Sequence, residues 1–185
     1  MRVRIGLIGA GRMGNVHATC LKEIPQAHIV AVADIVPARA HALAALWNAS
    51  AYTDYRALLD REQLDAVYIC TPTNVHAEPA CAVAERGLPF FIEKPLALTM
   101  REAQHIARAV EQNKMLTCVG YHWRYTNAAP SIYRVVEDSV DPLSRAEALI
   151  ALGSMRATEY ADASADAWRQ LLAFIRTGRV EGSSQ

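Results

Sequence analysis

The stretch VRIGLIGAGRMG at residues 3–14 decides the fold of this chain. It begins as an apolar, strand-like run and opens onto a Gly-x-Gly-x-x-Gly pattern formed by Gly9, Gly11 and Gly14. In such a pattern the first glycine permits a tight turn, the second lets the backbone approach a pyrophosphate, and the third lets the following helix pack close to the sheet. The N-terminus of that helix would present unpaired N–H groups and the positive end of its dipole to an anion.

A second apolar run follows at the distance that a dinucleotide-binding unit requires. HIVAVA spans residues 28–33 and ends at Asp34, which lies 20 residues after Gly14. At this offset a strand end returns to the first loop, and an acidic side chain there can accept hydrogen bonds from both hydroxyls of a ribose. The alternative is a glycine-rich turn in another kind of α/β unit. The two flanking strand-like runs and the acid favour dinucleotide binding.

The composition of the 185 residues, with 52% hydrophobic and 21% charged residues, is typical of a globular protein in water. The formal net charge is +0 and no basic stripe is evident, so we expect neither nucleic acid nor a membrane surface as a partner. The apolar stretch at the N-terminus is too short for a signal peptide, and no run is long enough to cross a membrane. These features predict a cytoplasmic protein.

The chain has four cysteines, which lie within apolar segments and form no Cys-x-x-Cys pair: Cys20, Cys70, Cys81 and Cys118. This pattern is typical of reduced core residues in a cytosolic protein. We therefore predict no metal site and no disulfide framework.

Strand-like and helix-like segments alternate over residues 1–122. Apolar runs predict strands at residues 3–8, 28–33, 66–70, 90–92 and 116–119, with a short strand at 52–53. Helices are expected at residues 13–24, 37–47, 54–60, 75–86 and 99–113. Asp54 can cap the third helix, Gly87 can close the fourth, and residues 99–102 have the spacing of a capping box. The alternation predicts an α/β fold, a doubly wound parallel Rossmann sheet, in a dinucleotide-binding domain at residues 1–122.

The pattern changes in residues 123–185, which we predict to be a short remnant of a second, α+β domain. Residues 128–136 are compatible with a helix, and residues 143–152 with either a strand or a short helix. Residues 163–177 carry an apolar stripe at helical spacing, which predicts an amphipathic helix.

The segment CTPTNVH at residues 70–76 follows a predicted strand, and ligands of open α/β sheets bind outside the carboxyl ends of the strands. Thr71 and Asn74 are short hydrogen-bonding residues suited to ribose or phosphate. His76 has two interpretations of equal weight: a functional side chain, or the first residue of a helix that faces water.

Glu93-Lys94-Pro95 follows the next strand, and a lysine in this place is unusual. Lys94, if partly buried there, could hydrogen-bond a substrate hydroxyl and assist its deprotonation. Pro95 is compatible with a rigid turn that contains a cis peptide bond. The alternative is a surface ion pair in a turn.

Aromatic and basic residues follow the last predicted strand, in YHWRY at residues 121–125. Arg124 could meet a carboxylate or phosphate of a ligand. An aromatic cluster that covers the edge of the sheet is an equally good interpretation.

Taken in order, GLIGAGRMG, Asp34, CTPTNVH, EKPLA and GYHWRY resemble the Gfo/Idh/MocA oxidoreductases over about residues 3–138. The resemblance implies a Rossmann domain that binds NAD(H) or NADP(H). It also implies hydride transfer at a hydroxyl-bearing carbon of a sugar, cyclitol or similar small molecule. Lys94 would be the catalytic lysine, and the residues along the cofactor would be Gly9, Gly11, Arg12, Met13, Gly14, Asp34, Thr71, Asn74, His76 and Glu93.

Within this resemblance the first loop would line the pyrophosphate, Asp34 would hold the adenosine ribose, and Glu93 would face the nicotinamide ribose. A carboxylate at Asp34 should repel a 2′-phosphate, which favours NAD over NADP. Arg39 lies near enough in sequence to weaken this preference, although it would sit one turn into the next helix.

Members of the family are about twice as long, and their second domain supplies a DxxxH element whose histidine acts with the lysine. The last histidine of this chain is His122, so we expect most of the second domain to be missing. The apolar surface left by that loss suggests a homo-oligomer. The sequence therefore supports two hypotheses: a dehydrogenase of this family, or an impaired module or fragment that binds NAD(H) without turnover.

Overall fold

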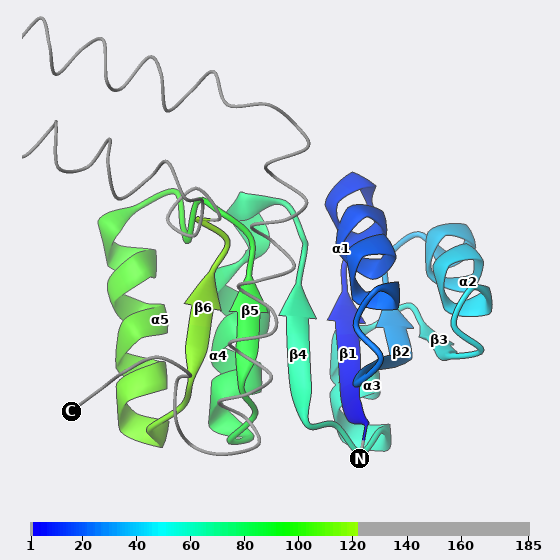
Figure 1. The fold of residues 1–185 in the computed structure, drawn as a ribbon. Coiled ribbons are helices and arrows are strands. Elements are labelled where there is room, and N and C mark those ends of the chain that lie inside the picture. The colour runs from blue at the N-terminus through cyan, green and yellow to red at the C-terminus, as the bar shows by residue number, and fades with distance from the viewer. Residues whose placement is uncertain (1, 122–185) are drawn as a thin grey trace, which may run out of the picture. The chain divides into compact units, whose positions relative to one another are not determined.

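The computed structural model describes residues 2–121, which form an α/β sandwich around one sheet (Figure 1). The sheet has six strands in the order β3-β2-β1-β4-β5-β6. Every pair of neighbouring strands is parallel. The strands are β1 Val3–Ile8, β2 Ala27–Ala33, β3 Ser50–Tyr52, β4 Ala66–Ile69, β5 Phe90–Ile92 and β6 Thr117–Val119. The predicted parallel, doubly wound sheet is confirmed.

Helices cover both faces of the sheet, and Figure 1 shows α1 in front of it and α4 behind. They are α1 Arg12–Lys22, α2 Pro37–Ala45, α3 Tyr55–Arg61, α4 Ala77–Glu85 and α5 Met100–Asn113, with a short 3₁₀ turn, η1, at Thr73–Val75. The chain moves outward from β1 to β3, returns to β4, and then moves outward the other way. Because such crossovers are right-handed, the helices of the two halves lie on opposite faces.

The strand order therefore reverses between β1 and β4, which are neighbours in the sheet. The backbone ladder continues into the loops that follow them. Gly9 N donates to Ala33 O at 2.7 Å, and Cys70 N donates to Ile8 O at 2.7 Å. Ligands of open α/β sheets bind in the crevice at this kind of reversal, so the fold places the first loop and the loop after β4 where a dinucleotide would lie.

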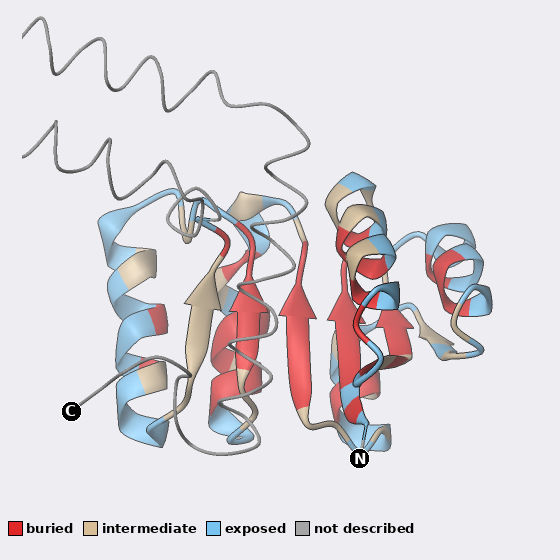
Figure 2. Ribbon diagram, in the orientation of Figure 1, coloured by how far each residue is buried: buried red, intermediate tan, exposed pale blue. Residues whose placement is uncertain are grey.

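The core lies along the central strands, which are almost wholly buried (Figure 2). All four residues of β4 are buried, as its uninterrupted apolar sequence predicts for a strand covered on both faces. Strands β3 and β6 lie at the two edges, and their residues are less buried. The central strands β1, β4 and β5 are thus the most buried, and the edge strands are the least buried.

Most helix ends follow the local signals in the sequence, although α1 and α2 end at Lys22 and Ala45, each two residues before the predicted end. Asp54 caps α3, Gly87 follows α4 with a φ of 69°, and Thr99 forms the predicted capping box at α5. The helix predicted to begin at residue 75 instead begins at Ala77, after η1. The amide of His76 closes a tighter turn onto Thr73 O, at 3.2 Å, which delays the α-helix.

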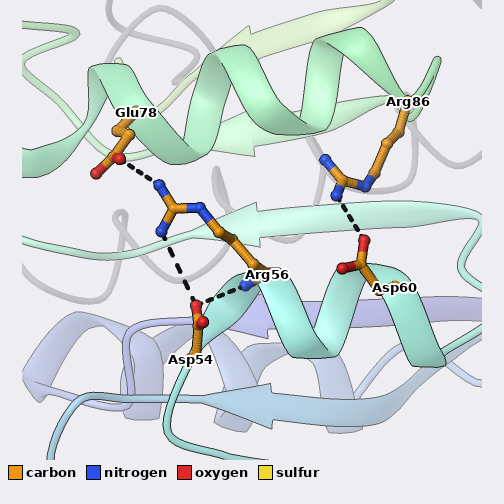
Figure 3. A network of polar contacts seen from close by, with 5 residues as sticks. All are labelled: Asp54, Arg56, Asp60, Glu78 and Arg86. Atoms are coloured by element: carbon orange, nitrogen blue, oxygen red, sulfur yellow. Dashed lines mark hydrogen bonds and ion pairs between the residues drawn. The ribbon is translucent and has the colours of Figure 1, made fainter.

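Exposed ion pairs join α3 to α4 (Figure 3). Arg56 pairs with Glu78 and lies 4.0 Å from Asp54, while Arg86 Nη2 lies 2.6 Å from Asp60 Oδ1. Such pairs contribute about 0–1 kcal/mol each, so they add little to a fold that its core already stabilises.

The cysteines within residues 2–121 are free thiols, two of them buried and two partly buried. Burial raises the pKa of the Cys20, Cys70 and Cys81 thiols, so these groups are protonated at neutral pH and are poor nucleophiles. No group of His, Cys, Asp and Glu in the described part of the chain could hold a metal ion. No helix in that part is long and apolar enough to span a membrane.

The predicted second domain at residues 123–185 lies outside the described residues, with its expected helices at 128–136 and 163–177 and the segment 143–152. Arg124 lies outside them as well.

Candidate dinucleotide-binding site

Two of the three glycines in the first loop are required by the fold itself. Gly9 has a φ of 99°, and a Cβ there would lie 2.7 Å from the carbonyl carbon of Cys70. A Cβ on Gly14 would lie 2.0 Å from the carbonyl oxygen of Gly9. A side chain at either position would force the turn or the helix away from the sheet.

The fold itself does not require a glycine at the second position, Gly11. Gly11 has an ordinary φ of −74°, and a Cβ there would meet no atom within 4 Å. Open space therefore lies next to the backbone at Gly11. This arrangement fits a pyrophosphate that approaches the main chain closely, as the sequence pattern predicts.

The N-terminus of α1 is free to bind an anion. Its N-cap, Gly11, offers no side-chain hydrogen bond, and its first turn holds no acidic residue. Side chains cap α3 (Asp54) and α5 (Thr99), whereas α2, like α1, has no side-chain cap and no acidic residue in its first turn. The first N–H groups of α1 and its dipole therefore remain available to a phosphate. Arg12, which is exposed, and Met13, which is partly buried, lie in this first turn.

Asp34 lies directly after β2 and ties this strand end to the glycine loop. Its Oδ2 accepts a hydrogen bond from Ala10 N at 2.8 Å, and its Oδ1 accepts one from Val36 N at 2.8 Å. The two amides fix the orientation of the carboxylate, and each oxygen keeps a further lone pair. The residue is partly exposed, so these lone pairs can reach ribose hydroxyls.

Thr71 and Asn74 lie in the loop after β4. The Thr71 hydroxyl is buried, and it has no hydrogen-bond partner within residues 2–121. A buried hydroxyl normally has a partner, so this group fits a contact with a bound ligand. Asn74 is exposed and free to rotate toward such a ligand.

His76 does not face water, so that interpretation of the residue is wrong. It is 1% exposed, and its ring lies between two backbone carbonyls. Nε2 lies 2.9 Å from Thr71 O, and Nδ1 lies 3.2 Å from Leu96 O. The ring therefore joins the loop after β4 to the loop after β5, and its contact with a cofactor stays a prediction.

Glu93 lies directly after β5 and is buried against α1. Its Oε1 lies 2.6 Å from His17 Nε2, and its Oε2 accepts a hydrogen bond from Lys94 N at 3.0 Å. Burial raises the pKa of the Glu93 carboxyl, but the hydrogen bonds and charges of His17 and Lys94 outweigh burial and leave that pKa below its ordinary value of 4.5. The carboxyl is therefore ionised at neutral pH.

Lys94 begins the turn that leaves the sheet beside Glu93. The peptide bond to Pro95 is cis, as the sequence suggested, but the lysine side chain is exposed rather than partly buried. Its backbone is held by Glu93, and the turn that follows it is held by His76 through Leu96 O. The amine can thus reach a ligand outside the sheet while its own main chain stays fixed.

The structure brings the predicted residues to one edge of the sheet, because they follow β1, β2, β4 and β5, which run parallel. The sequence interpretation missed His17, which supports Glu93 from α1. A signal was present: His17 lies on the buried stripe of α1, with Gly14, Ala18 and Leu21. A histidine on such a stripe needs a polar partner.

A family model described as "Oxidoreductase family, NAD-binding Rossmann fold" matches residues 3–121. The chain belongs to the Gfo/Idh/MocA oxidoreductase family. Residues 3–121 are thus an NAD-binding Rossmann domain, and the family resemblance read from the motifs is confirmed.

Several relatives carry the same domain. The inositol 2-dehydrogenase of Rhizobium meliloti (strain 1021) is 36% identical over 138 residues, which cover 75% of this chain and 42% of that protein. The rhizopine catabolism protein MocA of Rhizobium meliloti is 38% identical over 123 residues, 66% of this chain and 38% of that protein. An NAD binding oxidoreductase from Klebsiella pneumoniae of known structure has a TM-score of 0.65 and 34% identity, over 74% of this chain and 39% of that chain. This chain therefore spans about two fifths of the length of its relatives.

Proposed function

We propose that this chain acts in NAD-dependent hydride transfer to or from a hydroxyl-bearing carbon of a sugar, cyclitol or similar small molecule. The observation that carries the proposal is the loop at Gly11, where open space meets the uncapped N-terminus of α1. Membership of an oxidoreductase family supports it, and so do relatives named as inositol dehydrogenases.

The glycine loop, with Arg12 and Met13, would line the pyrophosphate. Asp34 would accept hydrogen bonds from the adenosine ribose, and its charge would disfavour the 2′-phosphate of NADP. Thr71, Asn74 and His76 would lie along the cofactor, and Glu93 would lie near the nicotinamide ribose. When bound, the nicotinamide ring would supply the hydride chemistry.

Lys94 would act as the general acid and base at the substrate hydroxyl. Its amine is exposed, while its backbone is held by the Glu93 carboxylate. A lysine in this position can move a proton to or from a hydroxyl within hydrogen-bond reach. We also propose that the protein works in the cytoplasm, and that it forms a homo-oligomer, which size-exclusion chromatography would test.

The first experiment is a titration of the full chain with NADH, followed by fluorescence. We expect saturable binding, and we expect Gly11→Ala to weaken it by about tenfold or more because the new methyl group occupies the phosphate side of the loop. The same variant should unfold at nearly the wild-type denaturant midpoint. Gly14→Ala is the matched control: its Cβ would collide with Gly9 O, so stability should fall strongly.

The second experiment mixes the full chain with NAD and a panel of polyols and sugars, and follows the absorbance of the reduced cofactor. Turnover that Lys94→Ala abolishes, and that Lys94→Arg does not restore, would support the general acid and base. Saturable NADH binding without turnover of any substrate would instead favour a nucleotide-binding module. Absence of NADH binding would overturn the proposed function altogether.

A further inference from the structure

One buried contact between a histidine and a carboxylate connects α1 to the turn that carries Lys94. His17 Nε2 lies 2.6 Å from Glu93 Oε1, and the two side chains are 4% and 8% exposed. The two residues are 76 positions apart in the sequence, and neither side chain caps a helix or ends a strand. The local structure therefore does not explain why His17 and Glu93 are paired.

The pair has a defined hydrogen-bond pattern. The Glu93 carboxylate can only accept, so His17 must carry its proton on Nε2. The other nitrogen, Nδ1, is buried and has no hydrogen-bond partner within residues 2–121. The ring packs edge-on against Phe91 with centroids 4.9 Å apart, which holds Nε2 toward the carboxylate. His17 is therefore fixed by packing and directed at one oxygen.

The second carboxylate oxygen of Glu93 fixes the main chain of the next residue by a hydrogen bond. Glu93 Oε2 accepts from Lys94 N at 3.0 Å. A carboxylate held at both oxygens cannot rotate, so the peptide between Glu93 and Lys94 is held as well. Rotation of the carboxylate away from His17 would release the Lys94 amide together with it.

Helix α1 thereby links two parts of the site. Its N-terminus meets the pyrophosphate loop at Gly11, and His17, further along the same helix, meets the end of β5. At a strand-order reversal the adenosine half of a dinucleotide lies over the β2 side, where Asp34 is, and the other half crosses toward β4 and β5. The His17–Glu93 contact thus sets the separation between the phosphate loop and the far half of the site.

We propose that His17 is a positioning residue for the nicotinamide end of the cofactor site, acting through Glu93 on the backbone of Lys94. The inference rests on the proposed function, because it assumes that the chain binds NAD(H). Under this proposal the His17–Glu93 pair contributes to ligand binding, and not to packing of the core alone.

The test compares two ligands of the full chain: NADH, and ADP, which lacks both the nicotinamide and the ribose that carries it. We expect His17→Phe, which keeps an aromatic ring, to weaken NADH binding by about tenfold or more, the size of one lost charged hydrogen bond. The affinity for ADP should stay within about twofold of wild type, since Gly11 and Asp34 are untouched. A general loss of structure would weaken both ligands alike.

Two conservative variants keep the test decisive if His17→Phe does not fold. In His17→Gln the amide nitrogen occupies nearly the place of Nε2, so NADH affinity should be restored. In His17→Asn the amide reaches only as far as Nδ1, so NADH affinity should fall while ADP affinity holds. Circular dichroism would confirm that both variants are folded.

Equal effects on the two ligands, or no difference between the Gln and Asn variants, would overturn the role of His17 while leaving the proposed function in place. If the wild-type chain binds neither NADH nor ADP, the proposed function fails, and the inference fails with it. A selective loss of NADH affinity, repaired by Gln, supports the inference.

Discussion

Two carboxylates follow two strands of the same sheet, yet they are held in opposite ways. Asp34, after β2, accepts from two backbone amides and stays partly exposed. Glu93, after β5, accepts from a buried histidine and from one amide, and is 6% exposed. The first carboxylate can still accept hydrogen bonds from a ligand. The second is enclosed and holds its own neighbours in place.

The difference shows how one edge of a sheet can both bind and position. Backbone amides orient Asp34 without covering it, because a main-chain donor needs no side chain of its own. The Glu93 carboxylate is covered by α1, and its burial is tolerated because His17 and the Lys94 amide each supply a donor. If the two carboxylates differ in this way, changes at each should have different consequences for stability and for ligand binding.

The largest expected effect is on stability, from removal of the donor to Glu93. His17→Phe should lower the free energy of unfolding by about 3–5 kcal/mol, because it leaves a buried carboxylate with one partner removed. Asp34→Asn should cost only about 1–2 kcal/mol, since the exposed side chain keeps water and one acceptor oxygen. Urea denaturation of the three proteins would measure both changes.

A double variant separates charge from packing in that result. His17→Phe combined with Glu93→Met removes the buried charge together with its donor, and such apolar replacements of an ion pair are often nearly neutral. The double variant should therefore be more stable than His17→Phe alone. If it is no more stable, the cost of the single change lies in the fit of the ring and not in an unpaired carboxylate.

The second prediction concerns cofactor choice at the exposed carboxylate. The wild-type chain should bind NADH more tightly than NADPH, because Asp34 repels a 2′-phosphate. Asp34→Asn should shift the ratio of the two dissociation constants toward NADPH by about tenfold or more, as expected when one close charge repulsion is removed. Parallel fluorescence titrations would measure the ratio.

The matched control for this change is Asp54→Asn, which neutralises a carboxylate at the start of α3. It should leave the ratio unaltered, since that helix does not belong to the glycine loop. Tighter binding of NADPH than NADH by the wild-type chain would contradict the assignment of Asp34.

The two carboxylates also differ in how much of their surroundings the sequence predicts. Asp34 is predictable because its spacing from the glycine pattern is local and the turn chemistry is specific. The partner of Glu93 is not predictable in the same way. His17 is separated from it by 76 positions, and only the packing of α1 on β5 brings them together.

Strands, helix caps and turns are also predictable, because they too depend on local sequence. The capping box at Thr99 and the apolar run of β4 depend on neighbouring residues alone. The start of α4 was missed by two residues, since a tighter turn at Thr73–Val75 precedes it. The sequence also did not predict that Lys94 is exposed. It shows that the lysine follows a buried strand, but it does not show the direction of the side chain.

The third prediction uses pH to examine the buried carboxylate. The pKa of Glu93 is lowered in the folded protein, so its ionised form contributes stability above its ordinary pKa of 4.5. That contribution should be lost as the pH falls from about 4.5 through the folded pKa. Glu93→Gln cannot titrate, so its stability should decline less over this range, in urea denaturations performed at a series of acidic pH values. Parallel curves for the variant and the wild type would contradict the pairing with His17.

The smallest effect is expected from a carboxylate that is paired but largely exposed to water. Asp60 accepts from Arg86 at 2.6 Å between α3 and α4, and its side chain is 61% exposed. Asp60→Asn should change the free energy of unfolding by no more than about 1 kcal/mol, and the change should shrink as salt is added. Denaturation at low and high ionic strength would measure it. The loss from His17→Phe should by contrast hardly depend on salt, because ions do not reach a buried pair. A salt-sensitive loss at His17 would mean that solvent enters around Glu93, and the two carboxylates at the edge of the sheet would then differ in degree only.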